Sequence, residues 1–558
     1  MRILRSLVVL LFCFTASVQA HTTPTNAAIA SAHPLATAAG KTILDQGGNA
    51  FDAAVAVAAA LAVVEPYSSG LGGGGFFLLH RARDGKQIMI DARERAPLRA
   101  SPTMYLDAAG KPLSRASLEG PLAAGIPGIP AGLAHLAKRY GRLTLSQSLA
   151  PAIRLAEHGF PADARYRALA QSNLALLQKQ AETAAQFLHR QSVPELESLV
   201  IQKYLAKTLR AIARRGAAGF YRGAVANEMI AAVNAAGGIW QDNDLKHYRV
   251  VERQPIIFDY RGMRIVSAAP PSAGGLTLGE ALHILEAYDL AALDPAPRMH
   301  LVAEALRRAY HDRARYMADP DYVSMPTQRL LSRRYADLRA ANLDPKNATL
   351  SASLEAIPSV QQGDQTTHFS IVDRQGNRVA ATLSINTFFG SGFVAGNSGV
   401  LLNNEMDDFA SVGNGHNTYS LVHSGPNRIA PGKRPLSSMS PTFVEDARGT
   451  LILGAPGGSR IISMVLLTIL NYQTQTTIDL PALVSAPRYH HQYLPDRLEV
   501  EPDSFPSAVL DELQLFGHII RVNERPWGNM QAVWIDRASG KAQAASDPRG
   551  QGSGEAWY

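Results

Sequence analysis

Two segments rich in β-branched residues, 366–373 and 378–386, stand on either side of a short glycine-containing sequence. This pattern predicts a β-hairpin with a tight turn. If the turn is centred on Gln375, cross-strand pairing places Thr366 opposite Ser384. A slip of one residue would turn every side chain to the other face, so the register of this hairpin constrains which residues can meet.

Thr366 has a hydroxyl that becomes a useful nucleophile only beside a base. If the bond between Gln365 and Thr366 is cut, the freed α-amino group, with a reference pKa of about 7.7–8.0, can act as that base within the same residue. Ser384 is then placed to hydrogen-bond the Thr366 hydroxyl or amine. Asn386 is expected on the same face because side chains alternate along a strand. A threonine pair that opens a strand is on its own typical of ordinary β-structure, so the prediction depends on the surrounding groups.

Charged side chains suited to a zwitterion occur in two further segments. Arg93 follows a predicted strand, where a guanidinium can bind a carboxylate in bidentate fashion. The acidic segment 403–408 includes Glu405 and Asp408, which can hold an ammonium group. Each segment alone is typical of a solvated loop.

Neutral donors occur in two later segments. Ser437 and Ser438 follow a proline and are suited to hydrogen-bonding a carboxylate. Gly457 and Gly458 precede a predicted helix at 461–470, so their backbone N–H groups can point at a developing oxyanion. An ordinary turn and an ordinary helix start are the alternatives for these two segments.

The remaining pattern indicates a mixed α and β protein. The alanine-rich runs 36–46 and 50–64 predict helices separated by a Gly-Gly-Asn break. Residues 120–317 read mostly as helices, with a strand pair at 254–267. Residues 342–365 are polar and have the composition of a mobile connector.

The N-terminal residues 1–20 read as a secretory signal peptide, with two arginines, an apolar run and a small-residue cleavage site before His21. The apolar run is too short to span a bilayer. The only cysteine, Cys13, lies inside this segment. The mature chain therefore has no thiol for a disulfide, a nucleophile or a metal site, which is compatible with the periplasm.

The net charge of +7 does not point to a nucleic-acid partner, because only 18% of the residues are charged. The arginines of 306–313 alternate with apolar and acidic positions, so we expect a solvated helix face there. The histidines show no metal-binding spacing, and neighbouring His490 and His491 are expected to be structural. No metal and no cofactor are predicted.

Together these segments resemble the γ-glutamyltransferase family (γ-glutamyltranspeptidase, glutathione hydrolase) of N-terminal nucleophile hydrolases. The similarity extends along nearly the whole mature chain, through residues 47–54, 72–76, 91–97, 270–275, 366–370, 403–409, 434–441, 457–460 and 546–549.

The resemblance implies an α+β fold, a four-layer αββα sandwich made as one precursor. Cleavage before Thr366 would give a large subunit, 21–365, and a small subunit, 366–558, interwoven in one domain as a heterodimer. By the same resemblance Thr366 is the nucleophile, Ser384 replaces a supporting threonine, and Gly457 and Gly458 form the oxyanion hole.

The resemblance also implies a substrate site and a lid. Tyr419, in the loop 412–431, corresponds to the aromatic residue of the lid found in many bacterial members. The groups expected to bind the α-carboxylate are Arg93, Ser437 and Ser438, and those expected to bind the α-amino group are Asn386, Glu405 and Asp408.

The implied activity is cleavage of the γ-glutamyl amide of glutathione and related small molecules, with transfer to water, amino acids or dipeptides. Membrane attachment after signal removal is not expected. A cephalosporin (glutaryl) acylase-like or poly-γ-glutamate-processing amidase on the same fold is the alternative. Asp408 favours a γ-glutamyl substrate, because a glutaryl group has no amine to neutralise. A non-catalytic periplasmic peptide-binding protein would not need Thr366 or the glycine pair.

Overall fold

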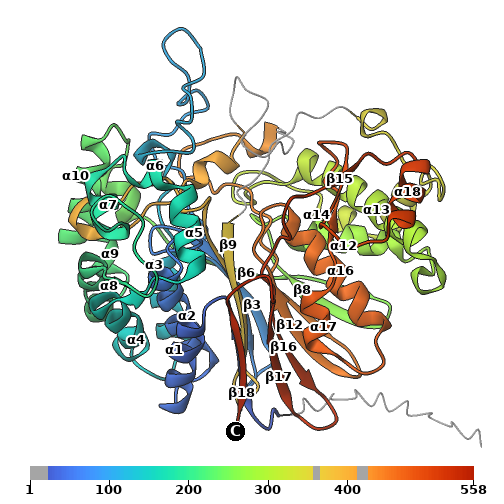
Figure 1. Ribbon diagram of the computed structural model, residues 1–558, viewed down its shortest axis with the longest axis horizontal. Coiled ribbons are helices and arrows are strands. Elements are labelled where there is room, and N and C mark those ends of the chain that lie inside the picture. The colour runs from blue at the N-terminus through green and yellow to red at the C-terminus, as the bar shows by residue number, and fades with distance from the viewer. Residues whose placement is uncertain (1–22, 356–364, 411–424) are drawn as a thin grey trace, which may run out of the picture.

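Two antiparallel sheets lie face to face between two layers of helices (Figure 1). The computed structural model describes residues 23–355, 365–410 and 425–558, so the predicted signal peptide lies outside the described residues. The layers confirm the predicted α+β sandwich. In spatial order the first sheet contains β18 (Ser553–Trp557), β1 (Ala27–Ser31), β9 (Gln365–Val372), β10 (Arg378–Asn386), β2 (Gly74–Arg81), β3 (Lys86–Asp91) and β6 (Val251–Arg253).

The second sheet is built mainly from the C-terminal part of the chain, with two strands contributed from before residue 365. In spatial order it contains β17 (Ala542–Ser546), β16 (Gln531–Asp536), β12 (Gly449–Gly454), β11 (Thr442–Glu445), β8 (Met263–Ser267) and β7 (Ile256–Tyr260). Both sheets therefore mix strands from the two sides of the Gln365–Thr366 bond, so the two predicted subunits are interwoven in both sheets.

The helices beside the first sheet come from the first half of the chain. Helix α2 (Ala50–Val64) is buried at every position, as expected of a helix that is apolar all round. Asn49 caps it and accepts hydrogen bonds from the first-turn N–H groups, which explains the break between the two alanine-rich runs. This layer contains α1 (Pro34–Asp45), α2 (Ala50–Val64), α3 (Ile129–Arg139), α4 (Leu145–His158), α5 (Ala164–Ser172), α6 (Leu174–Leu177), α7 (Ala181–Phe187), α8 (Lys203–Arg215), α9 (Ala218–Tyr221) and α10 (Ala224–Ala235), with the short pair β4 (Phe160–Pro161) and β5 (Leu199–Val200) and helix α11 (Asp242–Lys246) nearby.

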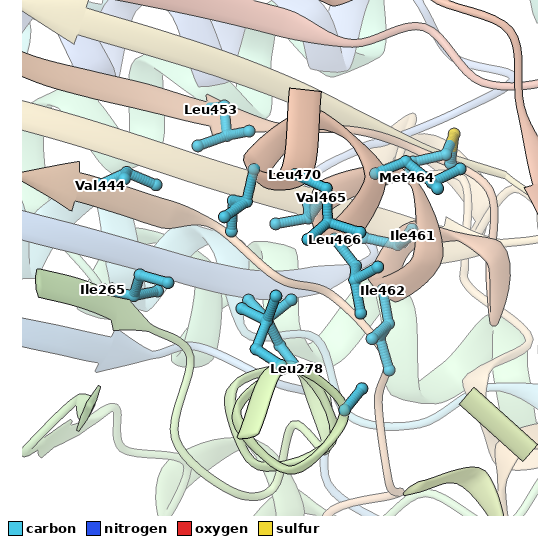
Figure 2. Packing of buried hydrophobic residues seen from close by; sticks show 14 of the residues in the cluster. Ile265, Leu278, Val444, Leu453, Ile461, Ile462, Met464, Val465, Leu466 and Leu470 are labelled. Carbon is cyan, nitrogen blue, oxygen red and sulfur yellow. The ribbon is translucent and has the colours of Figure 1, made fainter. Parts of the chain in front are cut away.

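The helices beside the second sheet form the opposite layer (Figure 1). Figure 2 shows side chains of α16 (Arg460–Thr474) in one apolar cluster with Leu278 of α12 (Gly274–Leu285) and the strand residues Ile265, Val444 and Leu453. Each such apolar side chain contributes about 1.5–3 kcal/mol when fully buried. The layer contains α12 (Gly274–Leu285), α13 (Pro295–Tyr316), α14 (Thr327–Leu330), α15 (Arg333–Ala340), α16 (Arg460–Thr474), α17 (Leu480–Ser485) and α18 (Ser507–Leu515), with β13 (Tyr489–His490), β14 (Leu498–Val500) and β15 (Ile520–Val522) forming a small third sheet.

The β9–β10 hairpin has the predicted register, with Thr366 paired to Ser384. Alternation sends odd-numbered side chains of β9 toward the first helix layer, where Thr367 Oγ1 donates to Glu65 at the end of α2. Even-numbered side chains face the second sheet, where Ser370 Oγ donates to the Gln531 carbonyl of β16. The side chain of Thr366 therefore points into the space between the sheets.

The prediction of a solvated helix face at 306–313 is wrong, because all eight positions are buried on α13. Two of its three arginines are neutralised inside the protein: Arg307 and Arg308 both bind Glu304, one turn back on the same helix. Interleaved charges resemble a surface pattern, but paired charges can also be buried when their hydrogen bonds are satisfied.

Residues 342–355, part of the predicted mobile connector, contact α13 and the 491–496 loop. Ser351 is buried, its N–H donates to Asp496 Oδ2 (2.7 Å), and its Oγ donates to the Tyr493 carbonyl (2.7 Å). The polar composition of this segment supplies partners to buried charges. Residues 356–364 lie outside the described part of the chain.

Within the described ranges, no helix combines the length and the apolar character that crossing a membrane would require.

Candidate functional site

Thr366 lies near the N-terminal end of β9, facing the glycine pair that precedes α16. The backbone N–H of Gly457 donates to Thr366 Oγ1 at 3.2 Å, and the Thr366 side chain is buried. Gly457 and Gly458 have φ angles of 134° and 56°, which side chains disfavour. Glycine at both positions allows this backbone turn, which brings the Gly457 N–H to the Thr366 hydroxyl.

Ser384 lies between the Gln365 carbonyl and the backbone of Asn386. Its Oγ donates to Gln365 O at 2.9 Å and accepts from Asn386 N at 2.7 Å. In the uncut chain the Ser384 proton is therefore directed at the carbonyl of the predicted cleavage bond, whereas the sequence predicted a bond to the hydroxyl or amine of Thr366. This contact polarises that carbonyl.

A bulge separates Ser384 from Asn386. The register shifts there, so that Asn386 pairs with Gln365, and Asn386 has a φ of 79°. Simple alternation along the strand did not predict this irregularity. The bulge aims the Asn386 N–H at Ser384, while its side chain donates to the Asn404 carbonyl at 2.9 Å.

One small pocket brings most of the predicted site residues together. Gly457 contacts Thr366 at its edge, and Tyr419 lies outside the described residues. Two apolar residues that sequence reasoning missed, Met439 and Ile461, also line the pocket. The predicted residues in the lining are Arg93, Thr366, Ser384, Asn386, Glu405, Asp408, Ser437, Ser438 and Gly458.

Arg93 is almost fully buried and is surrounded by carboxyl groups. Its Nη1 lies 2.9 Å from Glu405 Oε2 and 3.4 Å from Glu94 Oε2, and its Nη2 lies 2.5 Å from Asp408 Oδ2. The same guanidinium donates to the carbonyl oxygens of Pro435 and Leu436, both at 3.2 Å. Glu94 was not predicted as part of the site, although its place next to Arg93 was the available signal.

The carboxyl groups around Arg93 outnumber the donors that reach them. Glu94 Oε1, Glu405 Oε1 and Asp408 Oδ1 are buried and have no hydrogen-bond partner among the described residues. Burial, followed by the neighbouring charge of Glu405, raises the pKa of both Glu94 and Asp408 well above the usual range, and Arg93 only partly opposes this. An incoming cation would satisfy these oxygens.

Neither Ser437 nor Ser438 donates its hydroxyl proton to another described residue, so both protons can serve a ligand. Ser437 Oγ accepts from Met439 N at 3.1 Å, and Ser438 Oγ accepts from Arg313 Nη2 at 3.1 Å. A hydroxyl has one proton and two lone pairs, so each serine uses a lone pair on the protein and keeps its O–H to donate. The two serines can therefore donate hydrogen bonds to an anionic group. That group would lie next to the carboxyl groups that can bind a cation.

The pocket thus combines a hydroxyl nucleophile, a backbone donor at that hydroxyl, a donor group for an anion and a carboxyl group for a cation. It can position a small zwitterion with a carbonyl carbon near Thr366 Oγ1. Among the described residues, no group of three or more His, Cys, Asp or Glu side chains is arranged to hold a metal ion.

Comparison with known proteins agrees with this geometry. A family profile described as Gamma-glutamyltranspeptidase matches residues 36–557. The glutathione hydrolase proenzyme of Pseudomonas sp. (strain A14) is 41% identical over 97% of this chain and 95% of its own length. That of Escherichia coli (strain K12) is 40% identical over 93% of this chain and 90% of its own length. Among solved structures, the cephalosporin acylase from Bacillus halodurans superposes with a TM-score of 0.83 at 29% identity, covering 96% of each chain.

Proposed function

The chain belongs to the γ-glutamyltranspeptidase family, and on that premise we propose that it is a glutathione hydrolase and γ-glutamyltransferase. It cleaves the γ-glutamyl amide of glutathione and related compounds, and passes the γ-glutamyl group to water or to the amine of an amino acid or dipeptide. One observation carries the substrate assignment. Buried carboxylate oxygens without hydrogen-bond partners among the described residues lie beside Arg93, in the same pocket as Thr366.

The pocket cavity is about 20 Å³, so a γ-glutamyl group would bind by displacing the contacts that Arg93 makes with Asp408 and Glu405. Its α-carboxylate takes donors from Arg93, Ser437 and Ser438. Its α-ammonium takes acceptors from Asp408 and Glu405, whose contacts with Arg93 are replaced by contacts with the substrate. Because the ligand brings one charge of each sign, the pocket gains hydrogen bonds without a change in net charge.

Activation begins with the uncut chain. Thr366 Oγ1 attacks the Gln365 carbonyl carbon, which the Ser384 hydroxyl polarises, and the C–N bond to Thr366 breaks as its nitrogen takes up the proton. Water then hydrolyses the ester between Gln365 and Thr366. The products are a carboxylate at Gln365 and a free amine at Thr366, and the chains 21–365 and 366–558 remain together as a heterodimer.

Turnover uses the same hydroxyl. The Thr366 amine accepts the hydroxyl proton as Oγ1 attacks the γ-carbonyl, and the N–H groups of Gly457 and Gly458 stabilise the oxyanion. The proton passes to the leaving amine as the amide bond breaks, which leaves a γ-glutamyl ester on Thr366. Water or an acceptor amine then attacks the ester and restores the hydroxyl.

Substituting Thr366→Ala tests the proposal. The variant should remain one uncut chain without activity, whereas N-terminal sequencing of the active wild-type small subunit should begin Thr-Thr-His-Phe-Ser. Thr367→Ser is the matched control, because it keeps a hydroxyl toward Glu65 on the opposite face of β9 and should still be cleaved. Two normal subunits from the Thr366→Ala protein would overturn the proposal.

A glutaryl acylase is the second candidate, favoured by the structural similarity to a cephalosporin acylase. The two substrates differ only in the α-amino group that Asp408 and Glu405 would bind. A charged hydrogen bond contributes about 1.5–3 kcal/mol, so a γ-glutamyl anilide should be turned over roughly 10- to 100-fold faster than its glutaryl analogue. Equal rates would favour the acylase.

We also propose export to the periplasm with removal of residues 1–20, and a lid that includes Tyr419. Intact-mass analysis of the purified protein tests the first point, with a large subunit that begins at His21 as the expected result. Comparing Tyr419→Ala with the wild type on acceptors of increasing size tests the second.

A further inference from the structure

Arg313 is a buried arginine with no carboxylate partner among the residues that the structure describes. It lies on α13 directly behind the two pocket serines, and its side chain is 2% exposed. Its Nη2 donates to Ser438 Oγ at 3.1 Å, which is the only side-chain hydrogen bond it makes within residues 23–355, 365–410 and 425–558. Its Nε is buried without a partner there, and no carboxylate in those ranges lies within 4.0 Å of the guanidinium.

The other buried arginines of α13 show how unusual this is. Arg307 and Arg308 both contact Glu304 through charged hydrogen bonds, and Arg308 also donates to backbone carbonyls. Burial lowers the pKa of Arg313 to about 10, so it stays charged at neutral pH. Asp408, across the pocket, is the one carboxylate whose charge opposes this shift. A buried cation without a paired anion is costly, and an anionic ligand would relieve that cost.

We propose that Arg313 is a positioning residue for the carboxylate of the substrate, acting through Ser438. A guanidinium can only donate, so Ser438 must offer Arg313 a lone pair, and its single proton turns away toward the pocket. Arg313 thereby holds Ser438 as a donor to an anion, and its own charge is balanced when the α-carboxylate binds. This inference deepens the proposed function, on which it rests.

Measuring kcat and KM with two substrates tests the proposal. One is a γ-glutamyl anilide and the other is the 4-aminobutyryl anilide, which lacks only the α-carboxylate. Arg313→Met should lower kcat/KM for the first by about 10- to 100-fold, mainly through KM, since charged hydrogen bonds contribute about 1.5–3 kcal/mol. The slower reaction of the second substrate should change less than about threefold. Arg313→Lys should recover part of the loss, because it keeps the charge.

The control is Arg315→Met on the same helix, where the arginine is exposed and pairs with Glu355, and this change should leave both reactions as they are. In a Ser438→Ala background, Arg313→Lys should have little further effect if Arg313 acts through Ser438. If Arg313→Met fails to yield two subunits, the comparison of Arg313→Lys with and without Ser438→Ala still tests the proposal.

An equal loss on both substrates, or additive effects of Arg313→Lys and Ser438→Ala, would overturn the proposal and leave Arg313 a structural residue. Failure of the proposed function would differ, because the wild-type enzyme itself would then not turn over the γ-glutamyl anilide.

Discussion

Two buried clusters of charged side chains in this protein have similar composition. They differ in whether their carboxylate oxygens all have hydrogen-bond partners. The pocket cluster consists of Arg93, Glu94, Glu405 and Asp408. The ridge cluster consists of Glu304, Arg307 and Arg308 on α13, together with Thr349 and Ser351 of the segment packed on it. Both clusters are removed from water, so the difference between them lies in how their hydrogen bonds are satisfied.

The ridge cluster is complete. Glu304 Oε1 accepts from Arg307 Nε (3.0 Å) and Thr349 N (3.1 Å), and its Oε2 accepts from Arg308 Nη1 (2.6 Å). Burial alone would raise the pKa of Glu304, but these donors outweigh burial and lower it to about 2. In the pocket cluster the pKa shifts of Glu94 and Asp408 go the other way. A satisfied buried cluster holds the fold together, and an unsatisfied one is ready for a ligand.

The largest expected effect is on stability, from Glu304→Gln. Removing the Glu304 charge leaves Arg308 without a carboxylate and Arg307 with Asp496 alone, so the free energy of unfolding should fall by about 3–5 kcal/mol. Glu157→Gln is the matched control, because its pair with Arg210 is partly exposed and should contribute less than about 1 kcal/mol. Denaturant unfolding of the purified heterodimers measures both, and a loss below about 1 kcal/mol for Glu304→Gln would contradict the comparison.

The pH dependence of the same variant sharpens this test. The folded-state pKa of Glu304 is lowered from 4.5 to about 2, so its stabilising contribution is present above pH 4.5 and is lost as the pH falls toward 2. The stability difference between wild type and Glu304→Gln should therefore shrink over that range.

Asp408→Asn should have the next largest effect, on activity. The neutral amide loses the charged contact with the substrate ammonium, so kcat/KM should fall by about 10- to 100-fold. The melting temperature should not fall, because the change relieves repulsion from Glu405 and Glu94, which still pair with Arg93. Asp407→Asn is the control, since Asp407 accepts from Ser117 and lies outside the pocket lining. If Asp408→Asn lowered Tm by several degrees and kept full activity, the pocket cluster would serve stability and not substrate binding, which would contradict the comparison.

The smallest expected effect comes from Thr349→Val in the ridge cluster. Thr349 Oγ1 accepts from Arg308 Nη2 at 3.0 Å, and valine keeps the shape but removes the acceptor. The free energy of unfolding should fall by about 1 kcal/mol, while the kinetic constants stay as they are. A change in KM with unchanged stability would contradict the separation between the clusters.

Sequence reasoning reached the pocket because its residues lie in short local patterns. The hairpin predicted the pairing of Thr366 with Ser384, and Gly457 could be assigned from its place before a helix. It missed the bulge at Asn386, because a bulge depends on what packs around the strand end. It missed Glu94 although this residue is next to Arg93, because adjacency in sequence does not show that both side chains are buried together.

The sequence by itself determined the strands, the caps and the order of the site segments, since these follow from side-chain periodicity and backbone preference over a few residues. Only the tertiary structure decided which charges are satisfied. Arg307 and Arg313 occupy the same helix and look alike in sequence, but one meets a carboxylate and the other faces a ligand pocket. The energy of a buried charge depends on partners brought from distant segments, and local sequence does not contain those distances.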